Sequence, residues 1–310
     1  MQDNSTKTNN GDKASSQLSI RLYTHNIRYA TSYPFKNELP WVKRAPLVIR
    51  SIRFHTLHNP EALICLQEVL HNQLLDILEG LGPEWAHVGV GRDDGNKAGE
   101  YSPILFRCCV WCVQSYETIW LSPTPETPSR GWDASNKRIL TSALLRHWES
   151  GQSVLALNTH LDDQGTKSRL ESAKIIIAHI ASRQQQFRSS QQKQQEQSEQ
   201  GQQEPLCKLP TFLAGDFNST PDEEAYLLLA TEESPLLDMM STVGKSERYG
   251  HENTFTGFEN RPVDQKRIDF LFLSKQCWHV QGYGVLETKF EDGVYSSDHR
   301  PVVGDVALPL

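Results

Sequence analysis

The chain has 310 residues, of which 31 are Lys or Arg and 38 are Asp or Glu, giving a net charge of −7. This length can bury a sizeable core, either as one large α/β domain or as two smaller domains. The negative balance excludes a protein that holds long polyanions in a general positive field, but it is compatible with a nuclease that has a local basic rim.

The amino-terminal segment is polar. Residues 1–17 contain no apolar run, which predicts a disordered leader with neither a secretion signal nor a membrane span. We therefore expect an intracellular protein, in the cytoplasm rather than the nucleus because the chain has no compact basic cluster. Without an oxidising compartment, the six cysteines are expected to be free thiols. No obligate protein partner can be identified from the sequence.

The first half of the chain is predicted to be rich in strands. Alternation of apolar and polar residues predicts a strand over 18–24, and a buried strand over 62–66 ends just before Glu68. Apolar residues at helical spacing predict helices around 41–52 and 72–81. The segments that follow are predicted as consecutive strands: 86–90, 103–107, 113–121, 139–148 and 153–159.

The second half contains one unusual segment. A helix with an apolar face is predicted over 166–182, and the glutamine-rich run 184–204 then lacks any apolar period. Such a run cannot bury enough surface to offset its ordering entropy, so we expect a disordered insertion, with a domain linker or a partner-binding tract as alternatives. The remaining predicted elements are a strand at 211–214, a short helix opened by Pro221, and strands at 267–273, 278–286 and 302–308.

Runs of strands interrupted by single helices favour mixed sheets over a regularly wound parallel sheet. The predicted fold class is α/β, a four-layer sandwich of two mixed β-sheets packed face to face with helices on the outside. Residues 18–310 are expected to form this single domain, with the insertion at 184–204 decorating one loop.

Four short polar runs close or follow apolar strands, at 66–69, 158–161, 215–218 and 297–301. Strand ends of this kind can place carboxylates, amides and histidines from distant parts of the sequence in one cleft. Such an arrangement is typical of a hydrolase. Oxygen ligands suit a hard cation, so the sequence predicts Mg²⁺, with Mn²⁺ as an alternative, rather than zinc. In extended geometry Asp216 and Asn218 face the same side, although Gly-Asp and Asn-Ser pairs are also common in tight turns.

Six motifs occur in order along the chain: Asn26, Gln67-Glu68, Asn158-Thr159-His160, Gly215-Asp216-Phe217-Asn218, Arg267-Ile268-Asp269 and Ser297-Asp298-His299. Together they resemble the endonuclease/exonuclease/phosphatase superfamily, which has the DNase-I-like fold. The runs 24–29, 99–104 and 130–134 are similar to a microbial branch grouped beside the deadenylase-like exonucleases. Members of that branch often carry an acidic residue after the first run, where this chain has Ala30 and Thr31.

The resemblance implies roles for the acidic and amide residues. It assigns Glu68 and Asp298 to the metal and Asp216 to aligning and deprotonating the attacking water. Asn218 would hold the phosphate, and Asn26 would position the metal or hold Glu68 without adding negative charge.

The resemblance also implies that His160 donates to the phosphate or leaving group and that His299 contacts the scissile phosphate. Asp269 is expected to hydrogen-bond His299 and favour its charged form. The alternatives are a packed core histidine at position 160 and an ion pair between Asp269 and Arg267.

Substrate contacts are less clearly indicated. Arg28, Arg138 and Trp132 could form a rim on which guanidinium groups meet phosphate and an indole stacks on a base or sugar. Surface ion pairs and a packed loop residue are the alternatives.

The function predicted from these residues is a Mg²⁺-dependent phosphodiesterase similar to 3′-to-5′ RNA exonucleases, acting on a phosphate ester such as single-stranded RNA. Water should attack in line without a covalent intermediate, because no serine or cysteine motif offers an activated nucleophile. The alternatives are a phosphatase or phosphodiesterase for a small sugar, inositol or lipid head group, and a catalytically silent binding or scaffold protein.

Overall fold

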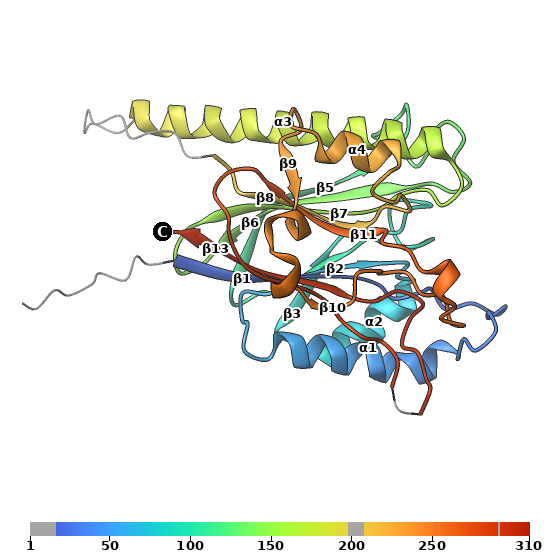
Figure 1. The fold of residues 1–310 in the computed structure, drawn as a ribbon. Coiled ribbons are helices and arrows are strands. Elements are labelled where there is room, and N and C mark those ends of the chain that lie inside the picture. Colours follow the sequence, from blue (N-terminus) through green and yellow to red (C-terminus); the bar gives the residue numbers. More distant parts are fainter. Residues whose placement is uncertain (1–16, 198–207, 291) are drawn as a thin grey trace, which may run out of the picture.

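The computed structural model describes residues 17–197, 208–290 and 292–310. Two mixed β-sheets pack face to face, with helices on both outer faces (Figure 1). The predicted α/β sandwich is therefore confirmed.

The first sheet has seven strands in the order β10-β12-β13-β1-β2-β4-β3. Their bounds are β1 Gln17–Asn26, β2 Leu63–Gln67, β3 Trp85–Val88, β4 Ile104–Arg107, β10 Tyr249–Gly250, β12 His279–Val285 and β13 Val302–Pro309. β1 pairs with β2 in parallel and with β13 in antiparallel orientation, so a parallel pair lies inside the sheet.

The second sheet has six strands in the order β5-β6-β7-β8-β11-β9. Their bounds are β5 Trp111–Trp120, β6 Ile139–His147, β7 Ser153–His160, β8 Thr211–Asp216, β9 Leu236–Asp238 and β11 Asp269–Ser274. β7 and β8 form a parallel pair, flanked by antiparallel neighbours. Each sheet thus contains one central parallel pair, and the strands of such a pair end at the same edge.

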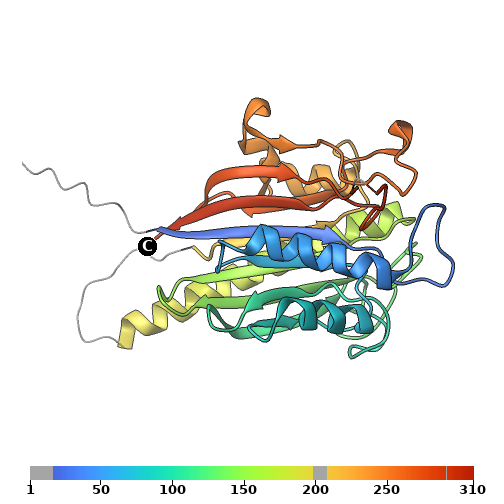
Figure 2. The ribbon, with the colours of Figure 1, turned by 90° about the horizontal axis from the view of Figure 1, so that it is seen from below.

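Alternation along the strands creates the layers. Leu18, Ile20 and Leu22 of β1 lie between the sheets with Ala156 and Phe212 of the second sheet. The outer face of the first sheet packs on α1 (Trp41–Thr56) and α2 (His71–Leu81), which lie on the face shown in Figure 2. The outer face of the second sheet packs on α3 (Thr166–Gln197) and α4 (Glu224–Ala230).

Several predicted boundaries differ from the observed ones. The short helix α4 begins at Glu224 and not at Pro221, and strand β11 begins at Asp269, two residues later than predicted. The three-residue strand β9 was not predicted, because so short a run carries no periodicity. Among the residues that the structure describes, Cys65, Cys108, Cys109 and Cys112 are free thiols, as expected, and no helix is long and apolar enough to span a bilayer.

The glutamine-rich run corrects a prediction. Residues 184–197 are helical and continue α3, whereas we expected disorder from Gln184 onward. Glutamine has a good helix propensity, and extending an existing helix needs no new nucleus. Phe187 also packs against the core of this layer. Residues 198–204 of the predicted insertion lie outside the described residues, as do residues 1–16 of the predicted leader, while Gln17 already pairs with Pro309.

The Gln184 side chain attaches this part of α3 to strand β8. Its Nε2 donates to Leu209 O at 2.6 Å and to Thr211 Oγ1 at 3.1 Å, and its Oε1 accepts from Leu209 N at 3.2 Å. Replacing Gln184 with alanine should lower the free energy of unfolding by about 1–3 kcal/mol, because buried backbone groups lose their partners. The matched control is Gln185→Ala, at an exposed position of the same helix. Equal urea midpoints for the two variants would contradict this prediction.

Candidate functional site

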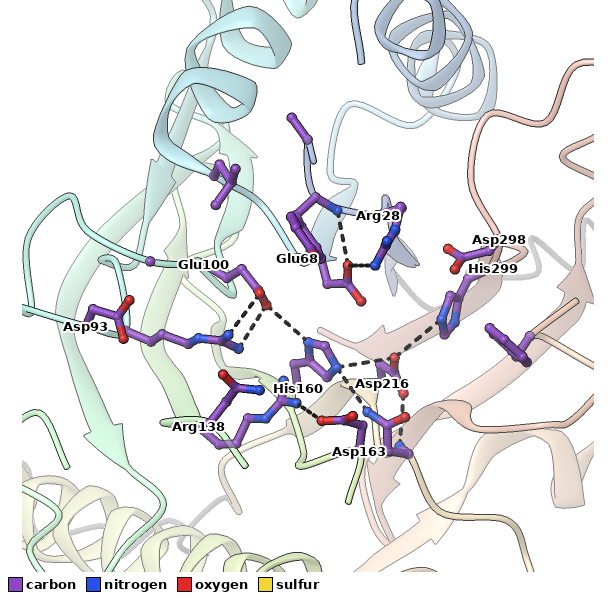
Figure 3. Close-up of a pocket in the computed structure, with 18 of the residues that line it drawn as sticks. Arg28, Glu68, Asp93, Glu100, Arg138, His160, Asp163, Asp216, Asp298 and His299 are labelled. Carbon is purple, nitrogen blue, oxygen red and sulfur yellow. Dashed lines mark hydrogen bonds and ion pairs between the residues drawn. The ribbon is translucent and has the colours of Figure 1, made fainter. Parts of the chain in front are cut away.

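The predicted site residues meet where the two central parallel pairs end. In the first sheet, Asn26 at the end of β1 is in register with Gln67 at the end of β2. In the second sheet, Asp216 at the end of β8 is in register with His160 on β7 and with Asp269 on β11. The sheets face each other, so both sets of strand ends open into one cleft (Figure 3).

Glycine at position 215 permits this arrangement. Gly215 has φ of 151°, and a Cβ atom there would run into the backbone oxygen of Thr159 on the neighbouring strand. Only glycine lets β8 approach β7 so closely immediately before Asp216. The lack of space for a side chain therefore explains why the Gly-Asp-Phe-Asn motif begins with glycine.

The cleft has a volume of about 650 Å³. Eight of the residues predicted for the site line it: Arg28, Glu68, Arg138, His160, Asp216, Asn218, Asp298 and His299. Asn26 and Asp269 lie behind this lining and hydrogen-bond Glu68 and His299, respectively. Trp132 is half-buried and is not among the lining residues in the described part of the chain, so its role on a substrate rim stays a prediction.

Three of the lining residues other than glycine have a left-handed backbone. The φ angles of Arg28, Glu68 and Asn218 are 58°, 58° and 46°. This conformation costs a residue other than glycine about 1–3 kcal/mol and persists only where the surrounding structure imposes it. All three residues directly follow or closely follow strand ends, so the chain turns sharply there and directs their side chains into the cleft.

One oxygen atom, Oδ2 of Asp216, lies at the centre of the polar groups. Asn26 Nδ2 donates to it at 2.9 Å, while His160 Nε2 and His299 Nε2 lie 3.5 Å and 3.7 Å away. The second carboxylate oxygen, Oδ1, accepts from the backbone N–H of Asn218. Burial, together with the charge of Asp269, raises the pKa of Asp216 to about 7. A carboxylate with a pKa near neutrality suits a general base.

Asn26 also donates from Nδ2 to Glu68 Oε1 at 2.9 Å, and its own Oδ1 accepts from Arg28 N. The same amide nitrogen therefore links Glu68 to Asp216. In this arrangement Asn26 directs a donor toward the carboxylates and positions them, and its expected role at the metal stays a prediction.

The hydrogen bond expected between Asp269 and His299 is present, with 2.9 Å between Oδ2 and Nδ1. Burial disfavours the charged imidazole, but the charges of Asp269 and Asp216 outweigh burial and raise the pKa of His299 well above its ordinary value. Arg267, the alternative partner considered for Asp269, pairs instead with Asp238.

His160 is a different kind of histidine. Burial, followed by the charges of Arg138 and Arg92, lowers its pKa well below the ordinary value, so the ring is neutral. Asn218 Nδ2 lies 3.0 Å from His160 Nε2 and 3.0 Å from Leu161 O. The two hydrogens of this amide can serve both acceptors, which leaves the proton of the neutral ring on Nδ1.

The sequence reasoning missed one wall of the cleft. Arg92 and Glu100 form a bidentate pair, with both N···O distances at 2.9 Å. Burial raises the pKa of Glu100 to about 7, against the opposing charge of Arg92. Both residues lie in or near the loop before β4, where no strand end marks them. The only available signal for Glu100 was its place in the Gly-Glu-Tyr-Ser-Pro-Ile run, which was used to identify the branch and not the site.

The arginine at position 138 lies in the same wall, as Figure 3 shows. Its Nε donates to Asp162 at 3.2 Å and its Nη2 to Asp163 at 2.8 Å. Asp162 is buried and accepts backbone N–H groups of Ser135 and Gly165, so it holds loops together. The neighbouring Asp163 lines the cleft.

Two sets of side chains could hold a divalent cation. Asp216, Asp269 and His299 offer ligand atoms within 4.8 Å of one another, but the last two are hydrogen-bonded to each other. Glu68 and Asp298, which the resemblance assigns to the metal, both line the cleft, and burial together with the charge of Glu68 raises the pKa of Asp298. Carboxylate oxygens suit a hard cation, and the assignment of these two residues to the metal stays a prediction.

Comparisons with known proteins agree with this fold. A crystal structure of an endonuclease/exonuclease/phosphatase from Bacteroides vulgatus is 32% identical, with a TM-score of 0.78, over 94% of this chain and 99% of that chain. The mannosyl-6-phosphatase of Bacteroides thetaiotaomicron is 29% identical, with a TM-score of 0.73, over 93% and 99%. The human Nocturnin catalytic domain is 18% identical, with a TM-score of 0.63, over 94% and 96%, a likeness that concerns the fold alone.

Curated proteins give no significant match to this chain. The model of the endonuclease/exonuclease/phosphatase family matches residues 24–299, which include every motif that resembled it. The chain therefore belongs to the endonuclease/exonuclease/phosphatase family.

Proposed function

We propose that the protein is a divalent-cation-dependent hydrolase of phosphate esters, in which water attacks phosphorus in line with the leaving alcohol. The observation that carries this proposal is the convergence of Asn26, His160 and His299 on one carboxylate oxygen of Asp216. Among the described residues that line the cleft, none is serine or cysteine, which supports direct attack by water over a covalent intermediate.

Each side chain has a role in this proposal. Asp216 accepts the proton of the attacking water, Asn218 and His299 donate to phosphate oxygens, and Asp269 keeps His299 charged and oriented. His160 is neutral and donates toward the alcohol side of the ester. Mg²⁺ or Mn²⁺, held by Glu68 and Asp298, would offset the negative charge of the non-bridging phosphate oxygens.

For the substrate we favour a phosphate ester of a small sugar or other polyol. Beyond the reaction centre Asp93, Glu100 and Asp163 line the cleft together with Arg92 and Arg138, so this region has no excess positive charge that would attract a polyanion. A cleft of about 650 Å³ has the size of a small-molecule site. The likeness to the Bacteroides mannosyl-6-phosphatase supports the same class.

Exonucleolytic cleavage of RNA from the 3′ end is the second candidate. It is favoured by three aromatic side chains in the cleft wall, Tyr29, Phe35 and Phe255, on which bases could stack. An intracellular, cytoplasmic site of action stays a prediction from the sequence.

The test is a substrate screen with Mg²⁺ and with Mn²⁺, using hexose 6-phosphates, inositol phosphates and labelled single-stranded RNA. We expect release of inorganic phosphate from a sugar phosphate that stops with chelator and is lost in Glu68→Gln. Stepwise shortening of RNA with intact sugar phosphates would favour the second candidate. Absence of hydrolysis of every ester by folded protein, or hydrolysis unaffected by both chelator and Glu68→Gln, would overturn the proposal.

A further inference from the structure

The wall of the cleft beside His160 is rigid and polar. Glu100 and Arg92 are joined twice, by the bidentate side-chain pair and by the bond from Arg92 N to Glu100 O at 3.0 Å. The indole of Trp120 donates to Arg92 O at 2.8 Å and fixes the loop from behind. These side chains are therefore positioned before any substrate arrives. Because the Glu100 carboxylate is already fixed, little side-chain entropy is lost when it binds a ligand.

Two donors in this wall are buried and unused. Arg138 gives Nε to Asp162 and Nη2 to Asp163, and its Nη1 has no hydrogen-bond partner among the residues that the structure describes. His160 Nδ1 likewise lacks a partner within the described ranges, and Glu100 Oε2, at 3.8 Å, is too far for a direct hydrogen bond. Buried donors of this kind cost free energy until a partner reaches them.

These groups surround one small cavity of about 10 Å³, lined by Arg92, Glu100, Arg138 and His160 among others. The same four residues line the large cleft, so the cavity lies in this wall. This volume holds one oxygen atom of the size of water. Two donors and one carboxylate match the needs of a single hydroxyl group, which accepts two hydrogen bonds and donates one.

The charges beyond the reaction centre are balanced. Arg28 pairs with Glu38, Arg92 with Glu100 and Arg138 with Asp163, so no guanidinium among the described residues lining the cleft lacks a carboxylate. A nucleic acid strand would bring a second phosphate into this region and find no free cation there. Alternating guanidinium and carboxylate groups instead suit a neutral molecule with several hydroxyls.

We propose that Arg92, Glu100 and Arg138, beside His160, form a subsite that binds a hydroxyl group of the substrate's alcohol part and thereby selects phosphate esters of small polyols. This inference rests on the proposed hydrolase function and names its substrate class. The hydroxyl donates to Glu100 and accepts from Arg138 Nη1 and His160 Nδ1. The subsite takes no part in bond breaking. The attacking water forms the new P–O bond and gives a proton to Asp216, the P–O bond to the alcohol breaks, and the alcohol oxygen takes up a proton from bulk water.

Substrate analogues test the subsite without any variant. Hexose 6-phosphates, their monodeoxy derivatives and n-hexyl phosphate present the same ester with a decreasing number of hydroxyls. We expect kcat/KM of wild type with Mg²⁺ to be about 100-fold or more higher for a hexose 6-phosphate than for hexyl phosphate, because a site built to bind a hydroxyl leaves its own buried groups unpaired when the hydroxyl is missing. One monodeoxy derivative should account for most of this loss.

Variants then identify the residues. Glu100→Gln should lower the ratio of kcat/KM between hexose 6-phosphate and hexyl phosphate by about tenfold or more, because the amide cannot replace a charged acceptor. Glu79→Gln, an exposed carboxylate on α2, is the matched control and should keep the ratio of wild type. If Glu100→Gln does not fold, Arg138→Lys, which retains the charge but loses the planar fork, serves as the second variant.

The outcomes separate this inference from the proposed function. Equal kcat/KM of wild type for hexose 6-phosphate and hexyl phosphate would mean that the cavity holds only solvent, and the subsite would be overturned while the hydrolase stands. A preference for RNA would overturn it in the same way. If Glu100→Gln lowered kcat/KM for hexose 6-phosphate and for hexyl phosphate by the same factor, the subsite role of Glu100 would be overturned, and Glu100 would be a positioning residue for His160. If wild type hydrolyses none of these esters, the proposed function itself fails.

Discussion

Replacing Asp216 with asparagine is expected to lower kcat by roughly 10²–10⁴-fold, the range that a general base contributes, while the protein stays folded. Asparagine keeps an acceptor for the backbone N–H of Asn218, which now bonds Asp216 Oδ1 at 2.9 Å. It cannot take a proton from water, and it removes one of the three carboxylates that favour the charged form of His299. Its amide nitrogen also replaces the oxygen that accepts from Asn26 Nδ2, so that hydrogen bond is lost as well.

The measurement is the initial rate of phosphate release with Mg²⁺ at saturating substrate, together with a thermal melt. Asp222→Asn is the matched control, because it removes an exposed carboxylate six residues along the chain and should retain the wild-type kcat. An Asp216→Asn protein that keeps more than about a tenth of the wild-type kcat would rule out the general-base role, since a base that contributes so little is replaceable.

The reaction centre could be predicted from the sequence because its residues follow buried strands. Glu68 and Asp216 come directly after or at the end of apolar runs, and parallel strands bring such ends to one edge. The partner of His299, Asp269, was predicted from the family resemblance and not from the strand pattern alone, which left an ion pair with Arg267 as an alternative. Residues at strand ends can be located from the periodic pattern of the strands that precede them. The structure brings these residues together in one cleft, as predicted.

The wall that carries Arg92 and Glu100 leaves no such signal. The two residues are eight positions apart in a loop, and only the closed loop makes them a bidentate pair. The prediction of disorder from Gln184 onward was wrong for another reason. The composition of this run indicates disorder, but the run continues a helix that is already formed, and contacts of Gln184 and Phe187 with the core stabilise the extension.

A buried arginine, Arg44, is the clearest case of a structural residue that the sequence hides. It lies three residues after Trp41 and four before Val48, on the apolar face of α1, but the sequence does not show which groups could satisfy a buried guanidinium there. In the structure its side chain is fully buried, and it donates to the carbonyls of Leu39, Ile27, Arg28 and Ser296 at 2.7–3.0 Å. These carbonyls belong to the segments that carry the first and last site motifs.

Replacing Arg44 with methionine should therefore destabilise the protein by about 3–5 kcal/mol, as expected when one member of a buried charged network is removed. Methionine fills much of the volume but leaves the carbonyls of Ile27 and Ser296 buried without a donor, and it removes the positive charge 3.7 Å from Glu38. Arg50→Met, at an exposed position of the same helix, is the matched control and should change the free energy of unfolding by less than about 0.5 kcal/mol.

Denaturant unfolding followed by circular dichroism measures both variants. The same network predicts that Arg44→Met also loses activity at temperatures where it is still folded, because Arg44 joins the backbone at Arg28 to the backbone at Ser296, next to the Asp298 and His299 motif. If Arg44→Met were as stable as Arg50→Met, the four carbonyls would have found other donors. The segments that carry Arg28 and Asp298 would then be aligned by the pairing of β1 with β13 and not by this side chain.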